Sequence, residues 1–185
     1  MTTATTTATE AQADPTGERA DLLQTLAQHR HFLRYTVRGL SDEQAGQRTT
    51  ASALCLGGLI KHVARAESNW VDFIVGGADA MAEGPKEWTA EKTAERWMAD
   101  FGMLPGETLA GILERYDEVA RRTDQVVAAL ADLDASQALP VAPWFPPGAR
   151  WTARRALLHI IAETSQHAGH ADIIRESLDG AKTMG

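Results

Sequence analysis

The sequence GETLAGILERYDEVARRTDQVVAALAD, residues 106–132, carries the clearest periodic signal in the chain. Its apolar side chains recur every three or four residues, which places them on one face of an α-helix. The charged residues between them would lie on the opposite, solvated face. We therefore predict a long amphipathic helix that buries one face in a helical bundle. The apolar face consists of Leu109, Ile112, Leu113, Tyr116, Val119, Val126, Val127 and Leu130.

The same spacing predicts three more long helices, over residues 18–40, 56–76 and 152–180. Thr152 can cap the last of them, and glycines at 76 and 77 provide an end for the second. Four amphipathic helices in one chain predict an all-α four-helix bundle.

Two irregular stretches separate these helices. Residues 78–102 form a long connection that Gly84-Pro85 interrupts, with one small helix predicted over residues 89–98. Residues 140–148 contain four prolines and a glycine, so we predict a loop there. Because no stretch alternates apolar and polar residues with period two, no sheet is expected.

Composition limits the class of protein. The chain has 185 residues, a formal net charge of −7 and one cysteine. This length suits one domain, expected over residues 18–180, with tails at 1–17 and 181–185 and the first of these disordered. The acidic, scattered charge argues against nucleic acid as a partner, and no apolar run is long enough for a membrane helix. We expect a soluble cytoplasmic protein whose metal ligands, if any, are histidines and carboxylates.

The last predicted helix carries residues with metal-binding chemistry. Glu163 and His167 differ by about 40° around the helix and about 6 Å along it, so both can reach one ion. His62, three residues after Leu59, lies on the inward side of the second helix and is the natural third ligand. Burial of a carboxylate and imidazoles is unfavourable unless a cation or hydrogen bonds compensate it. We predict a divalent metal site with one open position.

The other histidines leave alternatives open. His170 lies about 10 Å along the axis from Glu163, so we place it at the rim, as an alternative ligand. His159 extends the same polar stripe by one turn. His29 falls in the apolar stripe of the first helix and is expected to be a hydrogen-bonded core residue. Glu163 and His167 could also form an ordinary i,i+4 pair on a wet surface.

Several neighbours of the stripe are assigned structural roles. We expect Arg154, Arg155 and Arg175 to be solvated at the surface. Trp144 and Trp151, beside the proline-rich loop, are expected to pack rather than to stack on a substrate.

Three segments resemble the DinB-like superfamily, which includes the mycothiol-dependent maleylpyruvate isomerases. LIKHVARAE, residues 59–67, is similar to the second, metal-binding helix of these proteins. The common pattern of the last helix is His-x-x-x-His-Arg-Gly-Gln, and this chain reads ETSQHAGH at 163–170. Glu163 replaces the first histidine of that pair, as in the isomerase branch, whose metal is held by two His and one Glu. WTARRALLH, residues 151–159, resembles an actinobacterial branch with many members of unassigned reaction.

The resemblance implies an up-up-down-down four-helix bundle with a long connection between helices 2 and 3, and often a homodimer. It supports His62, Glu163 and His167 as ligands of one divalent ion, with zinc as the first choice and nickel or iron as alternatives. An ion there would activate a small thiol such as mycothiol. The implied function is a metal-dependent S-transferase or isomerase that acts on a small molecule.

Two other functions remain open. One is a metal- or ligand-binding module without turnover. The other is a zinc-water hydrolase in which His170 or His159 acts as general base.

Overall fold

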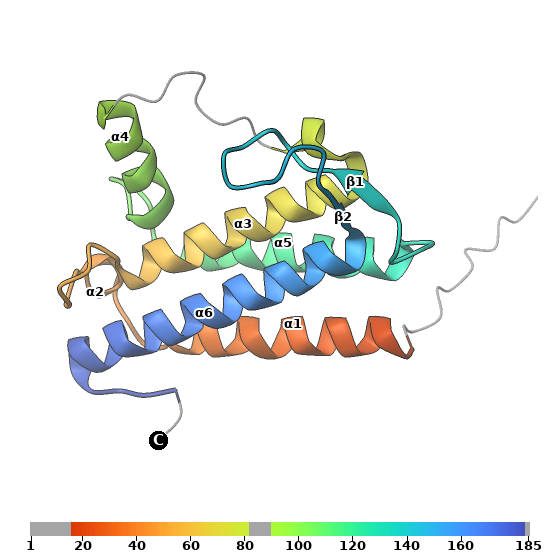
Figure 1. Cartoon of the computed structure of the whole chain (residues 1–185). Coiled ribbons are helices and arrows are strands. Elements are labelled where there is room, and N and C mark those ends of the chain that lie inside the picture. Colours follow the sequence, from red (N-terminus) through yellow and green to blue (C-terminus); the bar gives the residue numbers. More distant parts are fainter. Residues whose placement is uncertain (1–15, 82–89, 184–185) are drawn as a thin grey trace, which may run out of the picture.

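The computed structural model describes residues 16–81 and 90–183. Four long helices lie side by side in a bundle (Figure 1), which confirms the predicted all-α class. They are α1 (Glu18–Tyr35), α3 (Leu56–Gly76), α5 (Leu109–Ala129) and α6 (Ala153–Asp179). The short elements are α2 (Asp42–Gly46), η1 (Ala78–Ala80), α4 (Ala90–Phe101), β1 (Ser136–Ala138) and β2 (Arg150–Thr152).

The directions of the four helices differ from the expected up-up-down-down order. Arg19, at the start of α1, donates to the carbonyl of Val127 at the end of α5, so these two helices are antiparallel. Arg154, at the start of α6, pairs with Glu18 at the start of α1, so α1 and α6 are parallel. The order is up-down-down-up (Figure 1), because residues 36–55 reverse the chain at one end of the bundle. The long connection joins the parallel pair, α3 and α5.

Helix α1 ends earlier than its apolar stripe predicts. Its last residue is Tyr35, after which Thr36 donates its hydroxyl to the carbonyl of Leu33 and the chain turns. Gly39 then adopts a φ of 69°, which favours glycine. Apolar residues beyond the end of the helix, such as Val37, are nevertheless buried. The apolar stripe therefore predicted the buried residues correctly, although the helix itself is shorter than the stripe.

The capping chemistry after α1 builds a helix of its own. Ser41 accepts a hydrogen bond from the backbone N–H of Gln44, and the Gln44 side chain accepts one from the backbone N–H of Ser41. This capping box starts α2.

The expectation of no sheet is wrong in one place. Strands β1 and β2 form an antiparallel pair in which Ser136 faces Thr152 and Ala138 faces Arg150. Each strand has three residues, too few for an alternating pattern to be recognised in the sequence. The strands close the base of the proline-rich loop and lead directly into α6, which Thr152 caps as predicted.

The apolar interior consists of two clusters, one toward each end of the bundle. Helix α3 contributes to both and packs against α5 and α6. In the described parts of the chain, no helix combines the length and the apolar character needed to cross a membrane. The predicted N-terminal tail falls mostly on residues 1–15, which lie outside the described residues, as do residues 184–185 of the C-terminal tail.

Candidate metal centre

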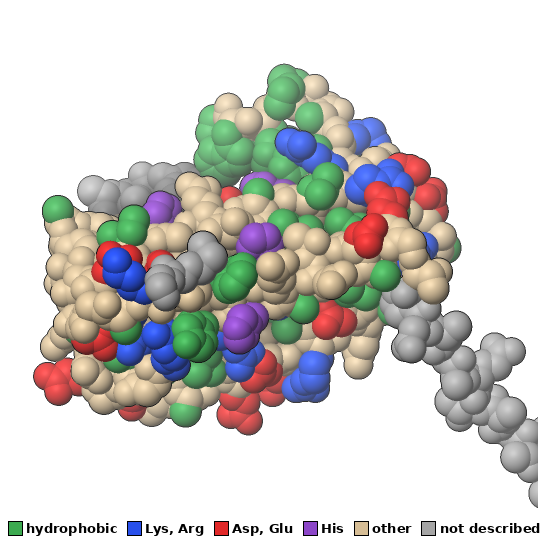
Figure 2. Space-filling view, turned by 90° about the horizontal axis from the view of Figure 1, so that it is seen from below, with side chains coloured by type: hydrophobic (Ala, Val, Ile, Leu, Met, Phe, Trp, Pro, Cys, Tyr) green, Lys and Arg blue, Asp and Glu red, His purple; other side chains and the backbone are tan. Residues whose placement is uncertain are grey.

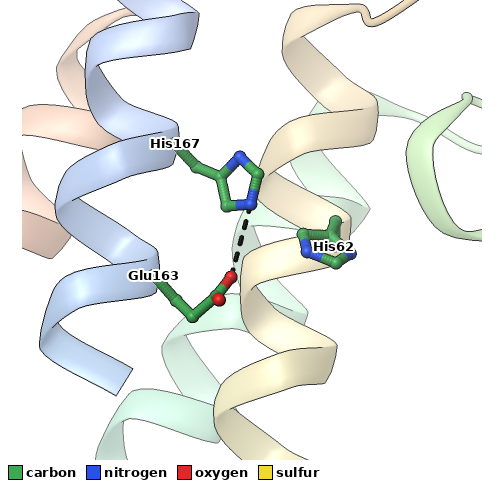
Figure 3. A group of neighbouring side chains, drawn as sticks. All are labelled: His62, Glu163 and His167. Atoms are coloured by element: carbon green, nitrogen blue, oxygen red, sulfur yellow. Dashed lines mark ion pairs between the residues drawn. The ribbon is translucent and has the colours of Figure 1, made fainter. Parts of the chain in front are cut away.

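Helices α3 and α6 bring His62, Glu163 and His167 together at the middle of the bundle (Figure 3). One ligand atom from each of the three side chains lies within 4.8 Å of the others. All three side chains are partly buried. Nε2 of His167 is 3.4 Å from Oε2 of Glu163, a separation typical of two ligands on one ion. The structure thus unites the three residues that the sequence singled out.

Glycines on α3 determine the surroundings of His62. A Cβ at Gly58 would lie 1.8 Å from the carbonyl oxygen of Phe101, so only glycine lets the end of α4 approach α3 this closely. As a result the ring of Phe101 stacks on His62, with ring centroids 4.0 Å apart. The centroid of His167 lies 4.9 Å from that of His62, edge-on. His62 is therefore held between an apolar ring and a second imidazole.

Burial and charge keep His62 and Glu163 in metal-binding forms. Burial, reinforced by the nearby His167, lowers the pKa of His62 to about 4, so its imidazole is neutral near pH 7. The hydrogen bond from His167 lowers the pKa of Glu163, which is therefore a carboxylate. Neutral imidazole and ionised carboxylate are the forms that bind a divalent ion.

An unpaired atom supports the fit to a metal. Nδ1 of His62 is buried and has no hydrogen-bond partner among the described residues. A buried polar atom without a partner is unfavourable by about 1–3 kcal/mol unless a ligand compensates it. Two imidazoles and one carboxylate suit zinc, with nickel and iron as alternatives, and leave a fourth position for substrate.

Two more histidines flank the centre on α6. Nε2 of His159 is 3.7 Å from Oε1 of Glu163, and its ring meets Trp70 and Trp151 edge-on. Burial lowers the pKa of His159. Nδ1 of His170 is 3.4 Å from Nδ1 of His167. Figure 2 shows histidine side chains reaching one face of the molecule, next to a protruding group of hydrophobic side chains.

A family model described as mycothiol-S-transferase matches residues 21–180. The chain belongs to the mycothiol-S-transferase family. This family is DinB-like, so the resemblance seen in the sequence is confirmed. No curated protein matches the chain significantly.

Solved structures share the fold of this mycothiol-S-transferase family member. A conserved protein from Enterococcus faecalis superposes with a TM-score of 0.64 at 13% identity, covering 90% of this chain and 100% of that one. A protein described as the sibling lethal factor precursor DfsB gives the same TM-score and the same coverages at 12% identity. Identities this low show a common fold alone.

Sequence reasoning missed a second buried polar cluster in this family member. Glu67 accepts hydrogen bonds from Nε and Nη2 of Arg30, at 3.2 and 2.5 Å, and from the hydroxyl of Thr123 at 2.6 Å. Nη1 of Arg30 donates to Asp124 at 2.9 Å. The cluster joins α1, α3 and α5. The sequence signal was spacing, because Arg30, Glu67 and Thr123 each lie three or four residues from apolar residues of the inward stripe of their helix.

Three single-residue expectations need correction. His29 is only partly buried and packs edge-on against Phe32, because the inward position of that turn belongs to Arg30. Arg175 is buried rather than solvated, since its Nη1 donates to the carbonyls of residues 36 and 38 where the chain leaves α1. Trp144 is 70% exposed, whereas Trp151 stacks on a second tryptophan as a packing residue should.

Proposed function

We propose that this chain is a metal-dependent S-transferase that joins the sulfur of a mycothiol-type thiol to an electrophilic small molecule. His62, Glu163 and His167 would hold the ion, with zinc as the first choice. The observation that carries the proposal is the meeting of three ligand atoms within 4.8 Å, in a family described as mycothiol-S-transferase.

The donor set suits thiol activation. A divalent ion held by one carboxylate and two neutral imidazoles keeps one positive charge and lowers the pKa of a thiol that approaches it. With an alkyl halide, the thiol gives its proton to solvent, its sulfur bonds to the electrophilic carbon, and the halide departs with the bonding electron pair. With a maleimide or an epoxide, the sulfur bonds to carbon, the electron pair of the broken C=C or C–O bond goes to the neighbouring carbon or to the oxygen, and that atom takes a proton from solvent. Glu163 and His62 contribute by keeping their ionised and neutral forms, respectively.

The reacting sulfur would come from the small thiol and not from the protein. Cys55 is the only cysteine of the chain. It is 2% exposed, and its Sγ lies 3.6 Å from the carbonyl oxygen of Phe101, packed under the end of α4. A thiol in that position cannot meet an electrophile at the metal centre.

The alternatives rank below S-transfer. Hydrolysis with His159 or His170 as general base remains an alternative from the sequence, whereas S-transfer is the activity that the description of the matching family names. Isomerase activity, a binding module without turnover, a homodimer and a cytoplasmic location remain predictions from the sequence.

The test begins with chelator-treated protein reloaded with zinc, nickel or iron. Each form is incubated with mycothiol and with alkyl halides, maleimides and epoxides, and conjugates are quantified by mass spectrometry. We expect zinc-dependent conjugation that Glu163→Gln lowers at least about 100-fold. Replacement of the exposed Gln166 by Leu on the same helix is the matched control and should leave the rate unchanged. Equal rates with and without metal, or no conjugate with any electrophile, would overturn the proposal.

A further inference from the structure

The two ring nitrogens of His167 face different partners. Nε2 faces Oε2 of Glu163 at 3.4 Å and so lies at the common point of the candidate metal centre. Nδ1, on the other side of the ring, lies 3.4 Å from Nδ1 of His170, one turn further along α6. His167 is thus enclosed by a ligand on one side and a histidine on the other.

This arrangement constrains where His167 carries its proton. A neutral imidazole has one N–H and one lone pair, so a ring that binds an ion through Nε2 must carry its proton on Nδ1. That N–H needs an acceptor, which metal-binding histidines commonly find in a neighbouring polar group. The group facing Nδ1 of His167 is Nδ1 of His170.

We propose that His170 is a positioning residue that, when an ion occupies the centre, accepts the Nδ1–H of His167 and so holds Nε2, free of a proton, toward the ion between Glu163 and His62. His170 then carries its own proton on Nε2, and one hydrogen bond fixes both tautomers. The inference rests on the proposed function, because it assigns to His167 the role of a metal ligand.

The same geometry argues against His170 as a ligand of the shared ion. The two nitrogens of an imidazole point in nearly opposite directions, so a group that faces Nδ1 is turned away from an ion on Nε2. The exposure of His170 agrees, since it covers the outer side of a ring whose own side chain is only 13% exposed.

The test compares His170→Leu, which removes the acceptor, with His170→Gln, whose side-chain oxygen can accept the same N–H. Gln166→Leu, an exposed position on α6, is the control. The Nδ1–H of His167 is followed in zinc-loaded protein by proton and nitrogen-15 NMR, with its signal assigned by its loss in His167→Gln, and its exchange with solvent is timed. Zinc affinity is then measured by competition with a chromophoric chelator, and circular dichroism checks that each variant is folded.

We expect a slowly exchanging Nδ1–H signal of His167 in the wild type and in His170→Gln, and a signal that exchanges rapidly with solvent in His170→Leu. Zinc affinity should fall about 10- to 100-fold in His170→Leu and stay within about threefold of wild type in His170→Gln. An equally slow exchange in His170→Leu, or zinc binding as tight as in Gln166→Leu, would overturn the inference.

Failure of the proposed function is distinguishable from failure of this inference. If the wild type binds no zinc, the proposed function fails and the positioning role of His170 falls with it. If zinc binds and supports conjugation but His170→Leu behaves like the control, the function stands and the positioning role falls.

Discussion

Helix α3 carries two inward-facing polar side chains, the partly buried His62 and the buried Glu67, whose surroundings differ in one respect. Glu67 is 1% exposed and accepts three hydrogen bonds from Arg30 and Thr123. His62, five residues earlier, has a buried Nδ1 without a hydrogen-bond partner in the described chain. In the first cluster, protein groups alone satisfy the buried carboxylate. In the second, the ligand atoms of His62, Glu163 and His167 face one another, and these three residues include no lysine or arginine.

This contrast distinguishes a polar group that stabilises the fold from one that is arranged to bind a ligand. Buried charge is tolerated when protein partners satisfy it, as the guanidinium of Arg30 satisfies Glu67. Buried donors that converge without such partners weaken the fold until a ligand arrives. Substitutions in the Glu67 cluster should therefore mainly lower stability, whereas substitutions in the metal centre should mainly lower metal affinity.

Glu67→Ala should have the largest effect on stability. It leaves the guanidinium of Arg30 buried with only the half-exposed Asp124 as partner, so the free energy of unfolding should fall by about 3–5 kcal/mol. Urea denaturation followed by circular dichroism measures the change. Glu163→Ala is the comparison, because removal of an acidic group beside two histidines should lower stability by less than about 1 kcal/mol. Equal losses in the two variants would remove the contrast.

His167→Ala should lower metal affinity and leave the fold intact, the reverse of the effect of Glu67→Ala. Zinc affinity should fall at least about 100-fold, which corresponds to about 2.7 kcal/mol of binding free energy, because a ligand rather than its support is removed. The helical circular dichroism should stay unchanged, since bundle packing holds the fold. Retention of stoichiometric zinc by this variant, measured by elemental analysis after dialysis, would exclude His167 from the ligand set.

Sequence reasoning reached the bundle and the triad because both depend on helical periodicity. The spacing put His62 on an inward face with Leu59 and put Glu163 and His167 on one face of their helix, but it left a surface i,i+4 pair open. The resemblance to DinB-like proteins selected the metal site. Helix direction was not predictable in this way, since it depends on where residues 36–55 reverse the chain. Apolar periodicity also does not predict which charged residues lie at inward positions.

Arg30 and Arg175 illustrate that last gap. Both are buried, although an arginine in a stripe is expected to reach solvent. Each is satisfied by partners far away in the sequence, Glu67 for Arg30 and the carbonyls of residues 36 and 38 for Arg175. Such partners become visible only after the helices are packed.

A smaller effect is expected on the pH dependence of the free energy of unfolding of the metal-free protein. The pKa of His62 is about 4 in the folded protein, against 6.5 for a solvated histidine in the unfolded chain, so between these values the unfolded chain binds more protons. Stability from this group is present above pH 6.5 and is lost as the pH falls toward 4. Because His62 is partly exposed, we expect a loss of about 1 kcal/mol between about pH 7 and about pH 5. His62→Phe should reduce the slope, whereas His31→Gln, at an exposed position, should not. Identical slopes in all three proteins would contradict the assignment.

The smallest effect is expected when the closed cluster is replaced as a whole. In the double variant Arg30→Met with Glu67→Met, no buried charge is left unpaired, and Thr123 keeps a hydrogen bond to the carbonyl of Val119 at 3.0 Å. The free energy of unfolding should return to within about 1 kcal/mol of wild type, because apolar replacement of a buried ion pair is often neutral. Zinc affinity should be unchanged if the two clusters on α3 are independent. A double variant that is stable yet binds zinc weakly would instead show that the ion pair sets the position of α3, and with it the distance of His62 from Glu163 and His167.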